Sequence, residues 1–207
     1  MDKPSMPKVK SYDVGRCAAF RRTSDPWGAL SNMVSGFPIF AGGISLCASE
    51  VLYQACRYPH LPDLQQELLL SQTPFEAKLT SRSNARNSRP DWETVRVAVM
   101  TWCLRVKLAQ HYEALTGILR ATGNLEIVER TRDDIFWGAA PSGDQLTYVG
   151  RNVLGRLWSL LRRDVKRKPA VSMRRVEPPQ VPRFLLLGRE VGIISACSPT
   201  GAPGRVR

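Results

Sequence analysis

The strongest helical pattern in the chain lies between residues 152 and 165. Apolar residues recur there at i, i+3, i+4, i+7 and i+11, which is the spacing of one face of an α-helix. Asn152 precedes the pattern, and asparagine is a favoured residue at a helix start. We therefore predict a helix that opens at Asn152 and buries one stripe. The apolar members of that stripe are Leu154, Leu157, Trp158, Leu161 and Val165.

A second segment, from about residue 92 to 112, is apolar most of the way round. Such a helix is central to a hydrophobic core, and Asp91 is its expected cap. Upstream, Thr73-Pro74-Phe75-Glu76 combines a capping box with proline at the first helical position. This pattern predicts a helix that starts there, after another helix over about residues 63–71.

Short strands are expected beside these helices. The stretch from Gly36 to Ile44 carries strand-like residues between glycines, which is typical of a small hairpin. A further helix begins at Ser49, and Phe184 to Ile194 has the pattern of a second short hairpin. The pattern as a whole predicts a helix-rich core that opens with short strands.

Composition limits the classes of partner. The chain has 207 residues, 43% of them hydrophobic, so it can hold one ordinary globular core and a tail. Its net charge of +12 favours polyanionic partners, such as nucleic acids, nucleotides or pyrophosphates, without choosing between them. Five cysteines with no C-x-x-C pair argue against a disulfide framework and favour a reducing cytoplasm. No apolar run reaches the roughly 18 residues of a membrane helix.

The composition changes after residue 165. Residues 166–207 hold six prolines. They also hold nine basic and two acidic side chains, so this segment carries more than half of the net charge of the chain. We therefore expect an N-terminal extension over 1–17, one domain over 18–165, and a basic, mostly disordered tail over 166–207. The tail is either a solvated extension or an arm that tethers nucleic acid.

Four polar residues share one face of the helix predicted from Ser49. Glu50, Tyr53, Gln54 and Arg57 occupy positions i, i+3, i+4 and i+7. A surface helix would solvate such a face, and the helix dipole alone favours a glutamate in the first turn. A tyrosine in the polar stripe and a carboxylate near a glycine-rich loop instead favour a ligand site. Spacing alone leaves both interpretations open.

Two later stretches carry further candidate chemistry. Asp133-Asp134 runs into Phe136-Trp137-Gly138, which offers either a stacking surface for a base or aromatic core filler. Gly150 to Arg156 places two glycines around a helix start, where backbone N–H groups can receive a phosphate. The competing interpretation is a structural start capped by Asn152. The two histidines lack metal-ligand partners at helical spacing, so no metal site is expected.

Several of these residues belong to motifs that occur in a fixed order. The series opens with Asp25-Pro26-Trp27-Gly28-Ala29-Leu30-Ser31-Asn32 and continues with Glu50-x-x-Tyr53-Gln54-Ala55, Pro74-x-x-Ala77-Lys78, Arg89-Pro90-Asp91-Trp92, Lys107-Leu108-x-Gln110, Asp134-x-Phe136-Trp137-Gly138 and Gly150-x-Asn152-x-Leu154-Gly155-Arg156. In this order the motifs resemble those of the NADAR family, also called the YbiA-like superfamily. The resemblance covers about residues 20–163.

The resemblance implies a compact, mainly helical α+β domain with a short hairpin region near its N-terminus. It also implies an N-glycosidase that acts on ribose-linked substrates, and no cofactor is expected. Members of the family are linked to cleaving phosphorylated riboflavin-pathway intermediates and to removing ADP-ribose from guanine in nucleic acid. The alternative is a non-catalytic module that binds ADP-ribose or nucleotides.

The chemistry of such a reaction assigns expected roles to the motif residues. Breaking the bond between the anomeric carbon and nitrogen builds positive charge on the ribose, which a carboxylate can stabilise, or the carboxylate can activate water. The resemblance makes Glu50 the first choice for that role, with Asp134 assisting proton transfer. The residues expected to bind substrate are Asn32, Tyr53, Gln54, Lys78, Lys107, Trp137, Asn152 and Arg156.

One position departs from the family pattern. Many relatives carry lysine before threonine upstream of the D-P-x-G motif, whereas this chain has Arg22 before Thr23. A lysine amine can form a Schiff base with a ring-opened sugar, but a guanidinium does not deprotonate and cannot replace it. Lys78 and Lys107 match motif lysines and are candidates for an amine nucleophile, a phosphate contact or a structural partner.

Overall fold

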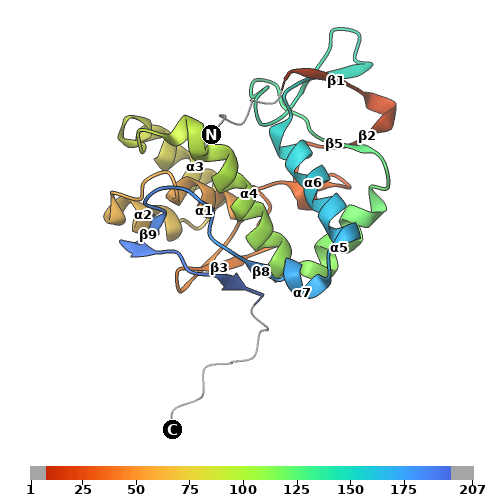
Figure 1. The fold of residues 1–207 in the computed structure, drawn as a ribbon. Coiled ribbons are helices and arrows are strands. Elements are labelled where there is room, and N and C mark those ends of the chain that lie inside the picture. Colours follow the sequence, from red (N-terminus) through yellow and green to blue (C-terminus); the bar gives the residue numbers. More distant parts are fainter. Residues whose placement is uncertain (1–7, 197–207) are drawn as a thin grey trace. The chain divides into compact units, whose positions relative to one another are not determined.

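The computed structural model describes residues 8–196 (Figure 1). Within that range the chain forms two units, each described here by itself. The first combines residues 8–36 with 113–168, and the second combines residues 37–112 with 169–196. Both contain helices and short strands, so the expected α+β class is confirmed. No helix in residues 8–196 has the length and apolar character needed to cross a bilayer.

The first unit is built from small sheets and the helices that follow them. A parallel pair of strands supports its long helix α6, which packs against β5. The elements are β1 (Lys10–Asp13), β2 (Cys17–Phe20), α5 (Tyr112–Ala121, in this unit from Glu113), β5 (Glu126–Glu129), β6 (Ala140–Pro141), β7 (Thr147–Gly150) and α6 (Val153–Arg167). β2 pairs with β5, and the order β1-β7-β6 is antiparallel throughout.

The second unit is organised around the long apolar helix α4 (Trp92–Gln110). A short helix, α1 (Ser49–Ala55), contacts α4 together with α2 (Pro62–Leu69) and α3 (Pro74–Ser83). The other elements are β3 (Ile39–Ala41), β4 (Ile44–Leu46), α7 (Ala170–Met173), β8 (Arg175–Val176), β9 (Leu185–Leu186), β10 (Arg189–Glu190) and β11 (Ile194–Ser195). The antiparallel pairs are β3 with β4, β8 with β11, and β9 with β10.

The predicted helix starts are confirmed, although two expected caps, Asp91 and Asn152, make no side-chain bond to their helices. At α3, the Oγ1 atom of Thr73 accepts the N–H of Glu76 at 3.1 Å, and a Glu76 carboxylate oxygen accepts the N–H of Gln72 at 2.8 Å. Asp91 occupies the cap position of α4 but makes no side-chain bond to the helix. Its carboxylate pairs instead with the guanidinium of Arg89, at 2.5 Å and 3.0 Å.

Both predicted hairpins form, and each turns through residues with positive φ. Gly42 and Gly43 connect β3 to β4 with φ values of 61° and 82°. Leu187 and Gly188 connect β9 to β10 with φ values of 51° and 74°. Two-residue hairpin turns need this left-handed backbone, which glycine adopts at little cost and leucine does not. The position of Leu187 therefore depends on contacts outside its own turn.

The segment after residue 165 differs from the expected disordered tail. Helix α6 extends through Arg167, and residues 169–196 belong to the second unit, where Met173, Val176, Val181, Phe184 and Leu186 are buried. Met173, Val176 and Val181 stand singly and produce no periodic signal, yet each can fill a gap in an existing core. The rest of the predicted tail, residues 197–207, lies outside the described range.

The expected N-terminal extension also contributes to a unit. Residues 10–13 form β1 and pair with β7, and Cys17 already belongs to β2. The buried side chain of Tyr12 joins a small cluster with Val128, Ala139 and Tyr148. The described part of this segment is therefore built into the first unit, so the proposed boundary at residue 18 does not separate a folded domain from an extension.

Phe184 tests whether the C-terminal segment is part of the core. Its ring meets the ring of Trp102 on α4 at a centroid distance of 5.0 Å and an interplanar angle of 84°. We expect Phe184→Ala to lower the free energy of unfolding by about 3 kcal/mol, because it leaves a cavity in a packed core. Urea denaturation measures the change. Val171→Ala is the control, since Val171 is 78% exposed on α7. Equal stability of the two variants would show that residues 169–196 do not pack as described.

Candidate active site

The polar face of α1 is buried rather than solvated. Glu50, Tyr53 and Gln54 are 6%, 5% and 7% exposed, and the other residues of α1 are buried as well. A buried carboxylate is costly unless it is hydrogen-bonded. The Nε2 atom of Gln54 donates to the Oε1 atom of Glu50 at 2.8 Å, one helical turn away. The interpretation of this face as an ordinary surface stripe is therefore excluded by its burial.

Tyr53 is held in its neutral form beside this carboxylate. Burial, followed by the charge of Glu50, raises the pKa of Tyr53 well above its usual value of 10.0, although Arg96 and Arg57 partly oppose the shift. The Tyr53 ring packs against the ring of Trp92 at 5.1 Å. The phenol therefore keeps its proton at neutral pH and offers an O–H donor in a fixed position.

Arg57 supports the same face from the end of α1. Its guanidinium lies over the ring of Trp92 at 5.7 Å, and its Nε atom donates to the hydroxyl of Ser88 at 2.6 Å. The ring of Trp92 therefore contacts both Tyr53 and Arg57, which lie one helical turn apart on the same face.

Helix α4 faces this group with further titratable side chains. Burial raises the pKa of Cys103 well above its usual value of 9.0, and the neighbouring thiol of Cys56 and the charge of Glu50 act in the same direction. The thiol of Cys103 is therefore protonated near neutral pH and acts as a small apolar group. Because this side of α4 is buried, the charge on Glu50 is weakly screened there.

Lys107, one turn further along α4, is completely buried. Burial lowers the pKa of its amine from 10.5 to about 7, and the amine lies 5.1 Å from the centre of the Phe37 ring. A substantial share of Lys107 is therefore a neutral amine at neutral pH, able to act as a nucleophile or base. Spacing in the sequence carried no sign of this burial.

In the first unit, Asp134 caps a turn that presents two aromatic rings. Its Oδ1 atom accepts the N–H groups of Phe136 and Trp137 at 3.2 Å and 3.0 Å. The two rings meet edge to face at 5.0 Å, and Arg151 lies over the ring of Phe136 at 5.8 Å. Asp134 is exposed and Trp137 is half-buried. These contacts give Asp134 a role in the shape of the turn.

The backbone N–H groups at the start of α6 are hydrogen-bonded to other parts of the chain. Asn152 has φ 48°, and its buried amide donates to the carbonyl of Ile127 at 2.8 Å and accepts the N–H of Glu129 at 3.1 Å. The backbone N–H groups of residues 152–154 donate to carbonyls of residues 136–138. Asn152 thus makes no side-chain cap, and we drop the interpretation of this helix start as a phosphate site.

The remaining predicted substrate ligands are dispersed. The Nε atom of Arg156 donates to the hydroxyl of Tyr12 at 3.0 Å, and its Nη2 atom donates to the carbonyl of Lys8 at 2.8 Å. Asn32 is buried after a short 3-10 helix at Gly28–Leu30, and Lys78 is exposed on α3. Within the second unit, the structure therefore brings together only Glu50, Tyr53 and Gln54 from the predicted set.

Comparisons with known proteins match this chain to a described family. The model of the NADAR domain matches residues 19–166. The chain belongs to the NADAR family. The N-glycosidase YbiA of Escherichia coli K12 is 34% identical over 143 residues, which cover 69% of this chain and 84% of that protein. The NMR structure of E. coli YbiA matches with a TM-score of 0.61 and 32% identity, covering 72% of this chain and 84% of that one.

Two further NADAR relatives carry names from riboflavin biosynthesis. The maize riboflavin biosynthesis protein PYRR is 30% identical over 158 residues, which cover 70% of this chain and 25% of that protein. The Vibrio vulnificus riboflavin biosynthesis protein VVA0006 is 33% identical over 160 residues, which cover 76% and 41%. The resemblance drawn from the motifs is thereby confirmed.

The first NADAR motif has a structural explanation in this chain. The Oδ2 atom of Asp25 accepts the N–H groups of Arg22 and Arg21, which holds the pKa of Asp25 below its usual value. A Cβ atom on Gly28 would lie 2.2 Å from the carbonyl oxygen of Thr23, so only glycine fits there. Arg22, at the position where the motif resemblance led us to expect lysine, is exposed at this turn.

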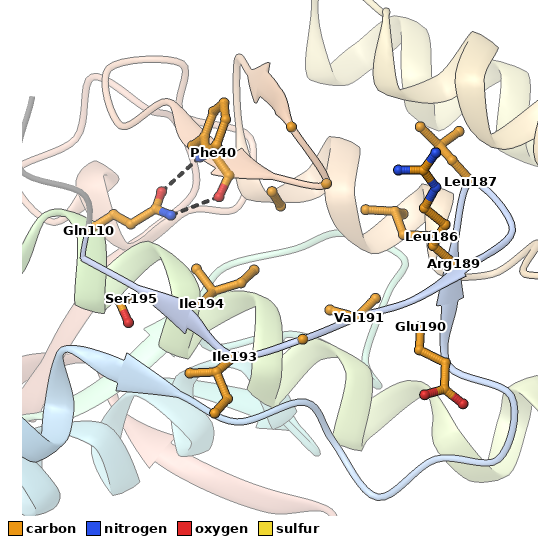
Figure 2. Close-up of a pocket in the computed structure, with 14 residues that line it drawn as sticks. Phe40, Gln110, Leu186, Leu187, Arg189, Glu190, Val191, Ile193, Ile194 and Ser195 are labelled. Atoms are coloured by element: carbon orange, nitrogen blue, oxygen red, sulfur yellow. Dashed lines mark hydrogen bonds between the residues drawn. The ribbon is translucent and has the colours of Figure 1, made fainter. Parts of the chain in front are cut away.

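A cavity of about 790 Å³ lies elsewhere in the second unit (Figure 2). It is bounded by the β3–β4 turn and by residues 186–195, with Gln110 at one side. The side chain of Gln110 donates to and accepts from the backbone of Phe40, at 2.8 Å in both cases. None of the predicted site residues lines this cavity. In residues 8–196, no group of three His, Cys, Asp or Glu residues could hold a metal ion.

The burial of Lys107 predicts a dependence of stability on pH. Between pH about 7 and 10.5 the unfolded chain holds the Lys107 proton that the folded chain releases, so this residue makes the protein more stable as pH rises. Lys107→Met lacks that contribution. Its gain in free energy of unfolding over wild type should be largest below pH about 7 and shrink toward higher pH. Urea denaturation at several pH values measures this, with the exposed Lys78→Met as control; a constant difference would contradict it.

Proposed function

We propose that this NADAR chain hydrolyses the N-glycosidic bond of a ribosyl substrate at the buried face of α1. The carrying observation is the carboxylate of Glu50, fixed by Gln54 at 2.8 Å beside the neutral hydroxyl of Tyr53. Relatives that share about a third of the residues are named N-glycosidases, which supports the same reaction class for this chain.

The chemistry divides between these three side chains. As the bond between C1′ and nitrogen breaks, positive charge grows on the ribose, and the carboxylate of Glu50 stabilises it or takes a proton from the attacking water. Oxygen from water bonds to C1′, and the released proton goes to the leaving nitrogen. Gln54 keeps Glu50 in place, while the hydroxyl of Tyr53 donates to a ribose oxygen. No metal or cofactor is required by this scheme.

Lys107 offers a second route that the chain retains despite Arg22. A neutral amine can attack C1′ of the ring-opened sugar, and the bond from C1′ to the base nitrogen then breaks as the protons of the amine pass to that nitrogen. The Schiff base left on C1′ is hydrolysed by water, which returns the free amine and the sugar aldehyde. The pKa of about 7 supports Lys107 for this role, because a lysine at its usual pKa is almost entirely protonated at neutral pH. Lys78, exposed on α3, lacks such a setting.

For the substrate, we favour a phosphorylated intermediate of riboflavin biosynthesis over ADP-ribosylated guanine. The names of the maize and Vibrio relatives support this choice. The half-buried ring of Trp137, held edge to face against Phe136, is suitable for contact with a base, so Trp137 stays a proposed substrate ligand. Free thiols at Cys17, Cys47, Cys56 and Cys103 support a cytoplasmic location.

Glu50→Gln tests the proposed reaction. We expect kcat to fall by about 100-fold or more with little change in folding, as for the loss of a positioned acid–base group. Both candidate substrates are assayed side by side, with release of the free base as the signal. Glu67→Gln, on the exposed side of α2, is the matched control and should keep the wild-type rate.

The outcome also separates catalysis from binding alone. If folded Glu50→Gln turns over at the wild-type rate, Glu50 is a structural residue and the assignment fails. If wild type binds ADP-ribose or a nucleotide in calorimetry but releases no base from either substrate, the chain is the non-catalytic module.

We also propose an electrostatic contact with nucleic acid at the end of α6. Arg163, Lys166 and Arg167 are exposed at i, i+3 and i+4, so they share one face of the helix. Replacing all three by glutamine should flatten the slope of log affinity against log salt for duplex DNA by about two to three, since each phosphate contact contributes about 0.9. Fluorescence anisotropy titrations measure the slope.

Hydrolysis of a free mononucleotide-sized substrate is the internal control for this triple variant. It should be unchanged, because the three side chains lie on the exposed face of α6. Equal salt slopes for the variant and wild type would show that these three side chains do not contact phosphates, and the proposed contact with nucleic acid would be rejected. Substitution is preferable to deletion, since residues 169–196 are packed into the second unit.

A further inference from the structure

Residues 169–196 lie beyond the family match at 19–166 and yet pack within the second unit. Two hydrogen-bonded bridges join this segment to the residues at the end of α1. The first runs through Gln65 on α2, and the second runs through Arg89 at the entry to α4. The carbonyls that accept these bonds belong to Ala55, the last residue of α1, and to Arg57, two residues beyond it.

In the first bridge, both the nitrogen and the oxygen of the Gln65 side-chain amide are hydrogen-bonded. It is fully buried, and its Nε2 atom donates to the carbonyl of Ala55 at 3.1 Å and to the carbonyl of Leu185 at 3.0 Å. Its Oε1 atom accepts the N–H of Leu187 at 2.8 Å. One side chain thus connects the last residue of α1 to the first strand and the turn of the β9–β10 hairpin.

Arg89 makes the second bridge through both its backbone and its side chain. Its N–H donates to the carbonyl of Arg57 at 3.0 Å, and its Nη2 atom donates to the carbonyl of Pro182 at 2.6 Å. Pairing with Asp91 fixes the guanidinium, which is 5% exposed. The segment before β9 is therefore tied to the residue that follows the last turn of α1.

Helix α1 needs such support. It has seven residues, and Ala48 at its cap position provides no side-chain hydrogen bond. A helix this short is not stable alone. Gln54, which holds the carboxylate of Glu50, lies in its last turn beside Ala55. A shift of that turn would move the amide of Gln54 away from Glu50.

We propose that the C-terminal segment positions the reactive face of α1, and that Gln65 is the positioning residue. The β9–β10 hairpin holds the amide of Gln65, Gln65 holds the carbonyl of Ala55, and the last turn of α1 then holds Gln54 against Glu50. Figure 2 shows this hairpin at Leu186 and Leu187, on one side of the large cavity. The catalytic part of the proposal rests on the proposed function, whereas the structural link does not.

Hydrogen exchange on the full chain tests the link without any substrate. In Gln65→Leu, the amides of residues 53–57 should exchange about fivefold faster or more, because the carbonyl of Ala55 loses its bond to Gln65 and keeps only the N–H of Tyr58. Gln66→Leu is the matched control, since Gln66 is the exposed neighbour of Gln65 on α2. Unchanged exchange over residues 53–57 in folded Gln65→Leu would overturn the proposal.

A substitution in the hairpin gives an effect of the opposite sign. Leu187→Asn replaces leucine by a residue that tolerates positive φ. The resulting Asn-Gly pair favours the two-residue turn between β9 and β10. A firmer turn should slow exchange over residues 53–57. Loss of folding cannot produce slower exchange. Slower exchange in Leu187→Asn would therefore support the link even if Gln65→Leu folds poorly. Unchanged or faster exchange in folded Leu187→Asn would count against the proposal.

Kinetics test whether the link reaches Glu50. Gln54→Leu removes the donor to Glu50 directly, so the acid limb of its rate profile should move to higher pH, since a carboxylate without a donor is more readily protonated. Gln65→Leu should move that limb in the same direction, and the double variant should add little to Gln54→Leu. A smaller folded fraction would lower the rate without moving the profile.

The two measurements separate the two proposals. Altered exchange with no hydrolysis by wild type on either substrate leaves the structural link standing and rejects the proposed function. Hydrolysis by wild type with a wild-type pH profile in Gln65→Leu supports the proposed function and rejects Gln65 as a positioning residue.

Discussion

Burial of the carboxylate of Glu50 is the constraint on which the second unit depends. An ionised carboxylate away from water must be hydrogen-bonded, and Gln54 supplies that bond from the next turn of the same helix. Because α1 is short and lacks a side-chain cap, its geometry comes from α2, α3 and α4 rather than from its own sequence. Burial of the Tyr53 side chain keeps its hydroxyl protonated, and the charge of Glu50 acts in the same direction.

The sequence predicted the elements whose signals are local. Capping at Thr73, the apolar stripe of α6 and the glycines of the β3–β4 turn each depend on neighbours a few residues away, and all three appear where expected. The parallel pairing of β2 with β5 joins residues more than a hundred positions apart and left no local sign. The packing of the C-terminal segment was not predicted for a similar reason, because Met173, Val176 and Val181 follow no period.

Candidate site residues divide in the same way. Helical spacing placed Glu50, Tyr53 and Gln54 on one face, and they do share a face because α1 is regular. Motif membership also selected Asn152 and Arg156, whose contacts with β5 and with Tyr12 are structural. A family motif preserves the fold as well as the chemistry, and a single sequence does not separate the two. The low pKa of Lys107 arises from burial by residues distant in sequence, which spacing cannot reveal.

The central claim, that this chain hydrolyses an N-glycosidic bond, is tested most directly by following both products of the reaction. Full-length protein is incubated with a phosphorylated N-riboside, and the base and sugar are analysed by mass spectrometry. We predict free base and free sugar in equal amounts. Recovery of intact substrate bound to folded protein, with no free base and no free sugar, would contradict it.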